Sequence, residues 1–425
     1  MLGIHRHRPV GIGLLACAAL ALALAPADTD ARADVHAATA VPATAAVSMG
    51  DSYISGEAGR WRGNSDDSNG SRDGTDRAWT GSGYDPARVY GATYANGCDR
   101  SDVAEVRSAP TVGQAQINLA CSGATTANIF RASHGGQPFK GEAPQADQLA
   151  VVAAHYRVQL IALSIGGNDL GFGDVITACV EDYVVYDSYC HTDQQRAVDG
   201  RMAAAMAGVA KSIDEIRAVM AAAHYTPRDY RIVLQSYPSP IPRSRENRYP
   251  ERGIGRIDTG GCPFWNVDSD WARDSLVPQI SNRLAAVAAS RGVQFLDLRD
   301  VLQGREVCST ATRQATSTEG PTAITSEWSR FLDYYYLQGK TQESFHPNYY
   351  AQLALGRCLT LMASRVTGNW SCHNTPGRDA SGMVLVSRTA AAVRCRVPAD
   401  SGPAPFRLRL KLPKAKLPKA LAARS

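Results

Sequence analysis

The sequence contains no Cys-x-x-Cys pair, although it has 10 cysteines among 425 residues. Structural metal sites usually take two ligands from such a pair, so neither a metal nor another cofactor is expected. Past the N-terminal region, no segment is apolar enough to cross a membrane. Acidic residues are absent from Phe406 onward, where seven Lys and Arg residues gather, but the rest of the chain is nearly neutral. The composition therefore does not predict a nucleic-acid binder.

The N-terminal residues have the pattern of an export signal. Arg6 and Arg8 precede an apolar run from Leu14 to Ala25, which is too short for a normal membrane-spanning helix. Ala31-Arg32-Ala33 then provides a small-residue cleavage pattern. A lipid-attachment site at Cys17 is the alternative, but the apolar run continues well past that cysteine. We therefore expect residues 1–33 to be a signal peptide and the protein to be secreted.

Nine cysteines follow the expected signal peptide, and exported proteins form disulfides among such residues. Pairing of neighbours predicts three bridges, Cys98 with Cys121, Cys179 with Cys190, and Cys262 with Cys308. Cys358, Cys372 and Cys395 compete for a fourth bridge, because the count is odd.

Short apolar runs alternate with helical patterns through most of the chain. The predicted strands lie at 45–49, 115–120, 158–165, 231–235 and 293–298, and the predicted helices at 202–220, 276–287 and 349–362. Such alternation is typical of a parallel sheet with helices on both faces. Reactive groups in these folds lie beyond the carboxyl ends of the strands.

Two regions depart from this alternation. Residues 60–84 are rich in Gly, Ser, Asp and Asn and predict a long, mobile loop beside the site. Trp61, Tyr84 and Tyr90 could line an acyl-binding cleft there or could equally be packing residues. Residues 373–425 lose the alternation and predict an extended basic tail, which could associate with anionic surfaces.

Three short motifs follow predicted strands, and a fourth lies between the last predicted strand and the last predicted helix. Gly50-Asp51-Ser52 and Gly166-Gly167-Asn168-Asp169 each come directly after an apolar run. Cys121-Ser122-Gly123 follows a third run, and Glu343 to Asn348 precedes the last predicted helix. Each motif alone could be a helix cap or a turn. Together they place a serine, a glycine, an asparagine and a histidine at one sheet edge.

On these motifs the chain resembles the SGNH hydrolases, the GDSL lipase/esterase family, in its secreted actinobacterial form. The resemblance covers Val47 to Cys372, with Tyr53 in place of the eponymous leucine. It implies a three-layer α/β/α sandwich around a parallel, flavodoxin-like five-stranded sheet, with residues 34–372 as the hydrolase domain. The Gly-x-Ser-x-Gly elbow of the α/β-hydrolases is absent from the sequence.

The resemblance implies that Ser52 is the nucleophile and His346 the general base. The oxyanion would be held by the Ser52 N–H, the Gly123 N–H and the Asn168 side chain. Many family members orient the histidine with an Asp three residues earlier, where this chain has Glu343. Some secreted relatives use a main-chain carbonyl two residues earlier, which here belongs to Ser344. We favour the Ser344 carbonyl, with Glu343 as the alternative.

The expected function is therefore that of a secreted, monomeric esterase or lipase that acts on lipid or small acyl esters. A carbohydrate acetylesterase and a phospholipase remain alternatives, because the oxyanion site would contact only the acyl carbonyl. A further alternative is a non-enzymatic envelope-binding module with an idle site.

Overall fold

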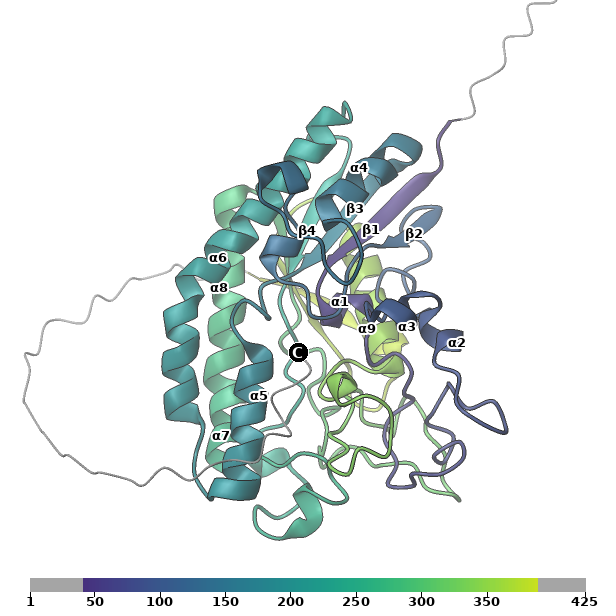
Figure 1. Cartoon of the computed structure of the whole chain (residues 1–425), viewed down its shortest axis with the longest axis vertical. Helices are drawn as coiled ribbons and strands as arrows, with labels where there is room; N and C mark the ends of the chain where they lie inside the picture. The colour runs from purple at the N-terminus through teal and green to yellow at the C-terminus, as the bar shows by residue number, and fades with distance from the viewer. Residues whose placement is uncertain (1–40, 389–425) are drawn as a thin grey trace, which may run out of the picture. The chain divides into compact units, whose positions relative to one another are not determined.

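A computed structural model of the protein describes residues 41–388 (Figure 1). The expected signal peptide, Cys395 and the basic residues from Phe406 onward lie outside this range. Within residues 41–388, no helix is both long enough and apolar enough to span a membrane.

Seven strands form one sheet in the order β2-β1-β3-β4-β5-β6-β7. The strands are β1 (Thr44–Gly50), β2 (Ala115–Asn118), β3 (Arg157–Ser164), β4 (Arg231–Gln235), β5 (Gln294–Asp297), β6 (Trp370–His373) and β7 (Val384–Ser387). All neighbouring pairs are parallel except β6 and β7. The first five strands have the 2-1-3-4-5 order of flavodoxin-like sheets, so the predicted mixed α/β fold is confirmed.

The expected strand count and the start of the expected tail are wrong. β6 extends the parallel sheet beyond β5, and β7 pairs antiparallel with β6. Residues 373–388 therefore belong to the sheet rather than to an extended tail. Met383 is 3 % exposed. These strands were missed because each has only four residues, and β6 is not a continuous apolar run.

Helices cover both faces of the sheet. The α-helices are α1 (Ser52–Ser55), α2 (Ala87–Tyr90), α3 (Thr93–Asn96), α4 (Gln145–His155), α5 (Phe172–Glu181), α6 (His191–Ala222), α7 (Asn266–Trp271), α8 (Val277–Arg291) and α9 (Tyr349–Ala363). Two π-helical segments, η3 (Asp182–Tyr186) and η6 (Ala272–Leu276), follow α5 and α7. Short 3₁₀ helices are η1 (Thr126–Asn128), η2 (Ala132–His134), η4 (Ser244–Glu246), η5 (Ile254–Arg256), η7 (Thr341–Glu343) and η8 (Ala380–Gly382).

Alternate residues of the strands enter two separate cores. Ile161 and Leu163 of β3 pack in the core that includes buried residues of α4, α6 and α8. Leu160 and Ala162 of the same strand pack in the core that includes α9. Figure 1 shows α6 and α8 side by side, away from α9. Because alternate side chains of a strand point to opposite faces, the sheet has helices packed on both sides and forms the middle of three layers. Loops occupy the ends of the strands.

Four disulfides lie among the described residues. Three of them are the predicted neighbour pairs, Cys98–Cys121, Cys179–Cys190 and Cys262–Cys308. The fourth joins Cys358 in α9 to Cys372 in β6. The sequence left Cys358, Cys372 and Cys395 as candidates for the fourth bridge, and the structure pairs the first two.

The long loop at residues 60–84 is attached to the body of the protein by buried contacts. Asp76 accepts two hydrogen bonds of 2.6 Å from Arg60 and pairs with Arg72. Trp61 is fully buried, with the guanidinium of Arg330 3.5 Å from its ring centre. Trp61 therefore packs in the interior and does not line a cleft.

Candidate active site

Ser52 lies where β1 ends and α1 begins, at the carboxyl edge of the sheet. Gly50 has a φ of +140°, and a Cβ atom there would lie 1.9 Å from the carbonyl oxygen of Ser164 in β3. A glycine is therefore required for the turn. The side-chain amide of Gln145 holds the same glycine through two hydrogen bonds of 2.8 Å. The backbone leading into Ser52 is fixed on both sides.

Asp51 is the N-cap residue of α1. The motif therefore contains a helix cap, as its alternative interpretation predicted, but Ser52 is not the capping residue. The Asp51 side chain accepts a 3.2 Å hydrogen bond from the N–H of Tyr53 and another from the hydroxyl of Tyr237. Burial raises the pKa of Asp51 to about 7, and the Tyr237 hydrogen bond opposes that rise. The side chain of Ser52 is left free to point elsewhere.

The hydroxyl of Ser52 meets the imidazole of His346. Ser52 Oγ lies 2.7 Å from His346 Nε2, and His346 Nδ1 lies 3.0 Å from the carbonyl oxygen of Ser344. The carbonyl can only accept, so Nδ1 carries the proton and the lone pair of Nε2 faces the Ser52 hydroxyl. Burial lowers the pKa of His346 to about 4. The imidazole is therefore neutral near pH 7 and able to take a proton.

The loop that carries His346 is held by backbone contacts. Phe345 has a φ of +62°, an uncommon conformation for a residue other than glycine. Its N–H donates to the carbonyl of Arg330 at 2.7 Å, and its carbonyl accepts a 3.1 Å hydrogen bond from the Tyr53 hydroxyl. The Tyr53 and His346 ring centres are 4.9 Å apart. Tyr53, where the resembled motif has leucine, thus links the serine turn to the histidine loop.

Glu343 has no side-chain hydrogen bond to His346 among the described residues, and only its backbone carbonyl accepts from the His346 N–H, at 3.3 Å. Its side chain accepts 2.6 Å and 3.1 Å hydrogen bonds from the Tyr90 hydroxyl and the Lys340 N–H. Glu343 is 2 % exposed, and its carboxyl group faces Tyr90 at the end of α2. The geometry favours the Ser344 carbonyl as the group that orients the imidazole, and it assigns Tyr90 to Glu343 rather than to an acyl cleft.

Two neighbouring loops carry the expected oxyanion donors. Gly123 has a φ of +83°, which suits glycine, and follows the disulfide-bonded Cys121. Asn168 Nδ2 donates one hydrogen to the carbonyl of Ala124 at 2.8 Å and has a second hydrogen to offer. Within residues 41–388, the N–H groups of Ser52 and Gly123 donate to no protein acceptor. Asp169 fastens the two loops by accepting from the Thr126 hydroxyl at 2.6 Å.

The sequence did not identify two groups at this site, Glu57 and Tyr237. Glu57 is buried, with Oε2 3.5 Å from His346 Nε2 and 2.6 Å from Ser122 Oγ. Tyr237 donates to Asp51 and accepts from the N–H of Gly167 at 3.0 Å. Neither belongs to the motifs that signalled the site, although Glu57 lies five residues after Ser52.

An apolar pocket begins beside the Ser52–His346 pair. Its cavity volume is about 80 Å³, below the usual range for ligand pockets, so the pocket is narrow. Tyr53 and Phe345, the chain neighbours of Ser52 and His346, form part of its lining. Helix α5 contributes Phe172, Val175, Ile176 and Cys179, and the segment from α7 to α8 contributes Asp268, Trp271, Ala272, Leu276 and Val277. The lining suits a hydrocarbon group.

Within residues 41–388, no group of three or more His, Cys, Asp or Glu side chains is arranged to hold a metal ion. The chemistry available at this edge is that of a serine, a neutral imidazole and N–H donors.

The parallel sheet with strand order 2-1-3-4-5 makes this an α/β protein. Ser52 and His346 lie in contact at the carboxyl edge of that sheet. The model of the GDSL-like lipase/acylhydrolase family matches residues 48–348, and the chain belongs to that family. It is accordingly a carboxylic ester hydrolase.

Solved structures similar to this chain include three secreted or acyl-hydrolysing proteins. An extracellular lipase from Streptomyces rimosus is 21 % identical, with 76 % of this chain and 100 % of that chain covered and a TM-score of 0.41. Phospholipase A1 from Streptomyces albidoflavus NA297 is 19 % identical, with the same coverages and TM-score. A carbohydrate acetylesterase from Sinorhizobium meliloti is 14 % identical, with 76 % and 98 % covered and a TM-score of 0.30. A search of curated protein sequences finds no match.

Proposed function

We propose that this protein is a secreted serine ester hydrolase that transfers the acyl group of an aliphatic ester to Ser52 and then to water. The contact of 2.7 Å between Ser52 Oγ and His346 Nε2 carries this proposal. A hydroxyl in hydrogen-bond contact with a neutral imidazole is the arrangement that activates a serine nucleophile.

In the first half of the reaction, His346 Nε2 takes the Ser52 proton as Oγ bonds to the acyl carbon. The Ser344 carbonyl holds the ring by accepting the Nδ1 proton at 3.0 Å. The negative oxygen of the tetrahedral intermediate accepts hydrogen bonds from the Ser52 and Gly123 N–H groups and from the Asn168 amide. His346 then donates its proton to the departing alcohol, and a water molecule repeats the cycle to release the acid.

The pocket beside the site favours aliphatic acyl esters over acetylated sugars. Its walls along α5 and the segment from α7 to α8 are mainly apolar, and a sugar would lose its hydration there without gaining matching hydrogen bonds. A hydrocarbon chain gains by leaving water for such a lining. Acyl-chain length should therefore govern turnover.

Secretion is the compartment proposed for this chemistry. Four disulfides lie among the described residues, and such bonds persist in oxidising environments. The signal-like pattern at residues 1–33 points the same way.

Labelling with a fluorophosphonate probe tests the nucleophile. We expect an adduct on the wild-type protein that maps to Ser52, no adduct on Ser52→Ala, and a loss of kcat on the order of 10³-fold or more in His346→Ala. Ser212→Ala is the control, because Ser212 is buried in α6 and donates to the Gly208 carbonyl away from the site. Folded wild-type protein that forms no adduct on Ser52 would sink the proposal.

A series of p-nitrophenyl esters from acetate to palmitate, with a phospholipid and an acetylated sugar, tests the substrate class. We expect medium-length acyl esters to exceed the acetate and the sugar in kcat/KM. Ile176→Trp, which fills the pocket, should reduce turnover of the longer esters but not of the acetate. Val151→Trp, at an exposed position of α4, is the matched control. Equal effects of Ile176→Trp on all esters would contradict the assignment of the pocket.

A further inference from the structure

A second carboxyl group lies within reach of the catalytic imidazole. Glu57 Oε2 is 3.5 Å from His346 Nε2, the nitrogen that contacts Ser52. The same oxygen accepts a 2.6 Å hydrogen bond from the hydroxyl of Ser122. Ser122 directly precedes Gly123, so one carboxyl touches both the base and the loop of an oxyanion donor.

The backbone holds Glu57 in this place. Its N–H donates to the Ser52 carbonyl at 3.3 Å, and its own carbonyl contacts the Tyr90 hydroxyl, whose one hydrogen is shared with the Glu343 side chain. The preceding Gly56 has a φ of +93°, and a Cβ atom there would lie 2.3 Å from Ser101 Oγ. Glu57 is therefore aimed at His346 by the same turn that carries Ser52.

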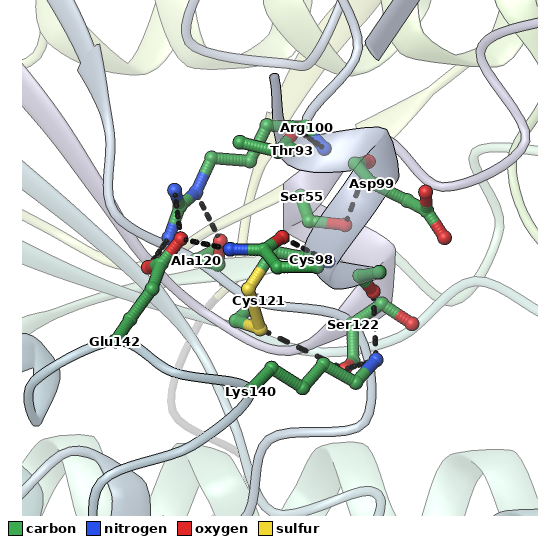
Figure 2. Close-up of a disulfide and its surroundings, with 12 residues drawn as sticks. Ser55, Thr93, Cys98, Asp99, Arg100, Ala120, Cys121, Ser122, Lys140 and Glu142 are labelled. Atoms are coloured by element: carbon green, nitrogen blue, oxygen red, sulfur yellow. Dashed lines mark hydrogen bonds and ion pairs between the residues drawn. A yellow bond between two sulfur atoms is a disulfide. The ribbon is translucent and has the colours of Figure 1, made fainter. Parts of the chain in front are cut away.

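The loop on the other side of the carboxyl is equally fixed. Figure 2 shows Lys140 extending past the Cys98–Cys121 disulfide to Ser122, and its Nζ donates to the carbonyls of Ser122 and Gly97, each at 2.7 Å. Ser122 is thus held at its carbonyl by Lys140 and at its hydroxyl by Glu57.

The carboxyl is a neutral acid at neutral pH. Burial raises the pKa of Glu57 to about 8; the Ser122 hydrogen bond opposes the rise, Asp99 and Glu343 add to it, and Lys140 opposes it. His346 is also neutral there, because burial lowers its pKa to about 4. The contact between the two side chains is therefore not an ion pair in the resting protein. Glu57 Oε1 is buried without a hydrogen-bond partner in residues 41–388.

We propose that Glu57 is a positioning residue that acts through His346 and Ser122, and that its ionised form stabilises the imidazolium produced when His346 takes the Ser52 proton. This inference rests on the proposed serine hydrolase mechanism. The Ser52 proton moves to Nε2 as before. Glu57 exchanges its own proton with solvent and neither gives it to nor takes it from the substrate.

A pH dependence follows from this arrangement. As the pH rises through the pKa of Glu57, a negative charge appears 3.5 Å from Nε2 and makes the imidazole a stronger base. The value of kcat/KM should then rise a second time near pH 8, by roughly threefold or more, above the plateau reached once His346 is deprotonated.

The test compares pH profiles of kcat/KM for p-nitrophenyl butyrate in the wild type, Glu57→Gln, Glu57→Ala and Ser122→Ala. Glu105→Gln is the matched control. Glu105 is also buried, burial also raises its pKa to about 8, and its side chain accepts a 2.5 Å hydrogen bond from Gln235 away from the site. Thermal unfolding of each variant reports on folding independently of activity.

We expect Glu57→Gln to keep the neutral-pH rate within a few-fold and to lose the second rise, which Glu105→Gln retains. Glu57→Ala should lose about tenfold in kcat at every pH with little change in KM, because both contacts disappear. A Glu57→Gln profile that superimposes on the wild type would overturn the inference even if Glu57→Ala fails to fold. Absence of ester hydrolysis in the wild type itself would instead refute the proposed function.

Discussion

Tyr53 shows how much one side chain can decide at this site. Its hydroxyl donates to the Phe345 carbonyl at 3.1 Å, its ring lies 4.9 Å from the His346 ring, and it forms part of the apolar pocket. A leucine at this position could pack but could not donate. The loop that carries His346 is therefore held by a hydrogen bond from the residue that follows Ser52, the proposed nucleophile.

Tyr53→Phe should loosen the histidine loop without emptying the pocket. We expect kcat to fall several-fold and the free energy of unfolding to decrease by about 1 kcal/mol, because one part-buried hydrogen bond is lost. Steady-state kinetics and urea unfolding measure both effects. Tyr84→Phe, on an exposed side chain, is the control. Unchanged kcat in Tyr53→Phe would show that the bond does not position His346.

Glu343→Ala separates the two groups considered for orienting the imidazole. We expect substantial activity to remain, because Nδ1 contacts the Ser344 carbonyl while Glu343 accepts from Tyr90 and Lys340. The melting temperature should fall, since the Tyr90 hydroxyl loses its side-chain acceptor. A loss of kcat equal to that of His346→Ala would reverse this assignment.

The sequence predicted the residues of the site that are carried by short motifs at strand ends. Ser52, Gly123 and Asn168 were predicted in this way, because parallel strands bring their carboxyl ends to one edge. His346 was predicted from its place before the last helix, and the structure brings it to within 2.7 Å of Ser52. Glu57 and Tyr237 were not found, since they contact residues 65 and 186 positions away through side chains alone. A pattern of neighbouring residues in the sequence cannot predict side-chain contacts between positions so far apart.

Two of the disulfides hold different elements of the fold. Cys98–Cys121 lies beside the loop of Gly123, the proposed oxyanion donor, whereas Cys358–Cys372 joins β6 to α9. The sequence predicted five strands from apolar runs but not β6 and β7, which are held by this bridge and by pairing at the edge of the sheet. Short strands of this kind form through tertiary contacts rather than local preference.

Removing each of these two bridges should have different results. Replacing both Cys358 and Cys372 by Ser should lower the free energy of unfolding by about 2–4 kcal/mol and leave kcat unchanged at 25 °C. Replacing both Cys98 and Cys121 should lower stability and kcat together, because Gly123 follows this bridge. Urea unfolding and p-nitrophenyl butyrate turnover distinguish the two cases. Equal losses of kcat would contradict the separate roles.

Stability of the whole molecule should depend on buried carboxyl groups. Burial raises the pKa of Asp51 and Glu306 to about 7, and that of Glu57 and Glu105 to about 8. Between the ordinary carboxyl pKa near 4 and these values, the folded protein binds more protons than the unfolded chain. Stability must therefore decrease as the pH rises through this window.

We expect the melting temperature to fall between pH 6 and pH 8. Calorimetry at fixed ionic strength measures this change, and Glu105→Gln should flatten part of it. His346 cannot cause the trend, because its lowered pKa affects stability only at pH values below its unfolded pKa of about 6.5. A melting temperature that stays level or rises over this range would refute the assignment of these groups as neutral acids.

Ser52 and His346 are separated by 294 positions, yet they share one hydrogen bond. Strands β1 to β4 lie within residues 44–235 and can pair while the histidine loop is still unattached. Contacts that close the longest loops are slow to form. Recovery of esterase activity after refolding should therefore lag behind recovery of the sheet, so that turnover reports the last step of folding and not the first.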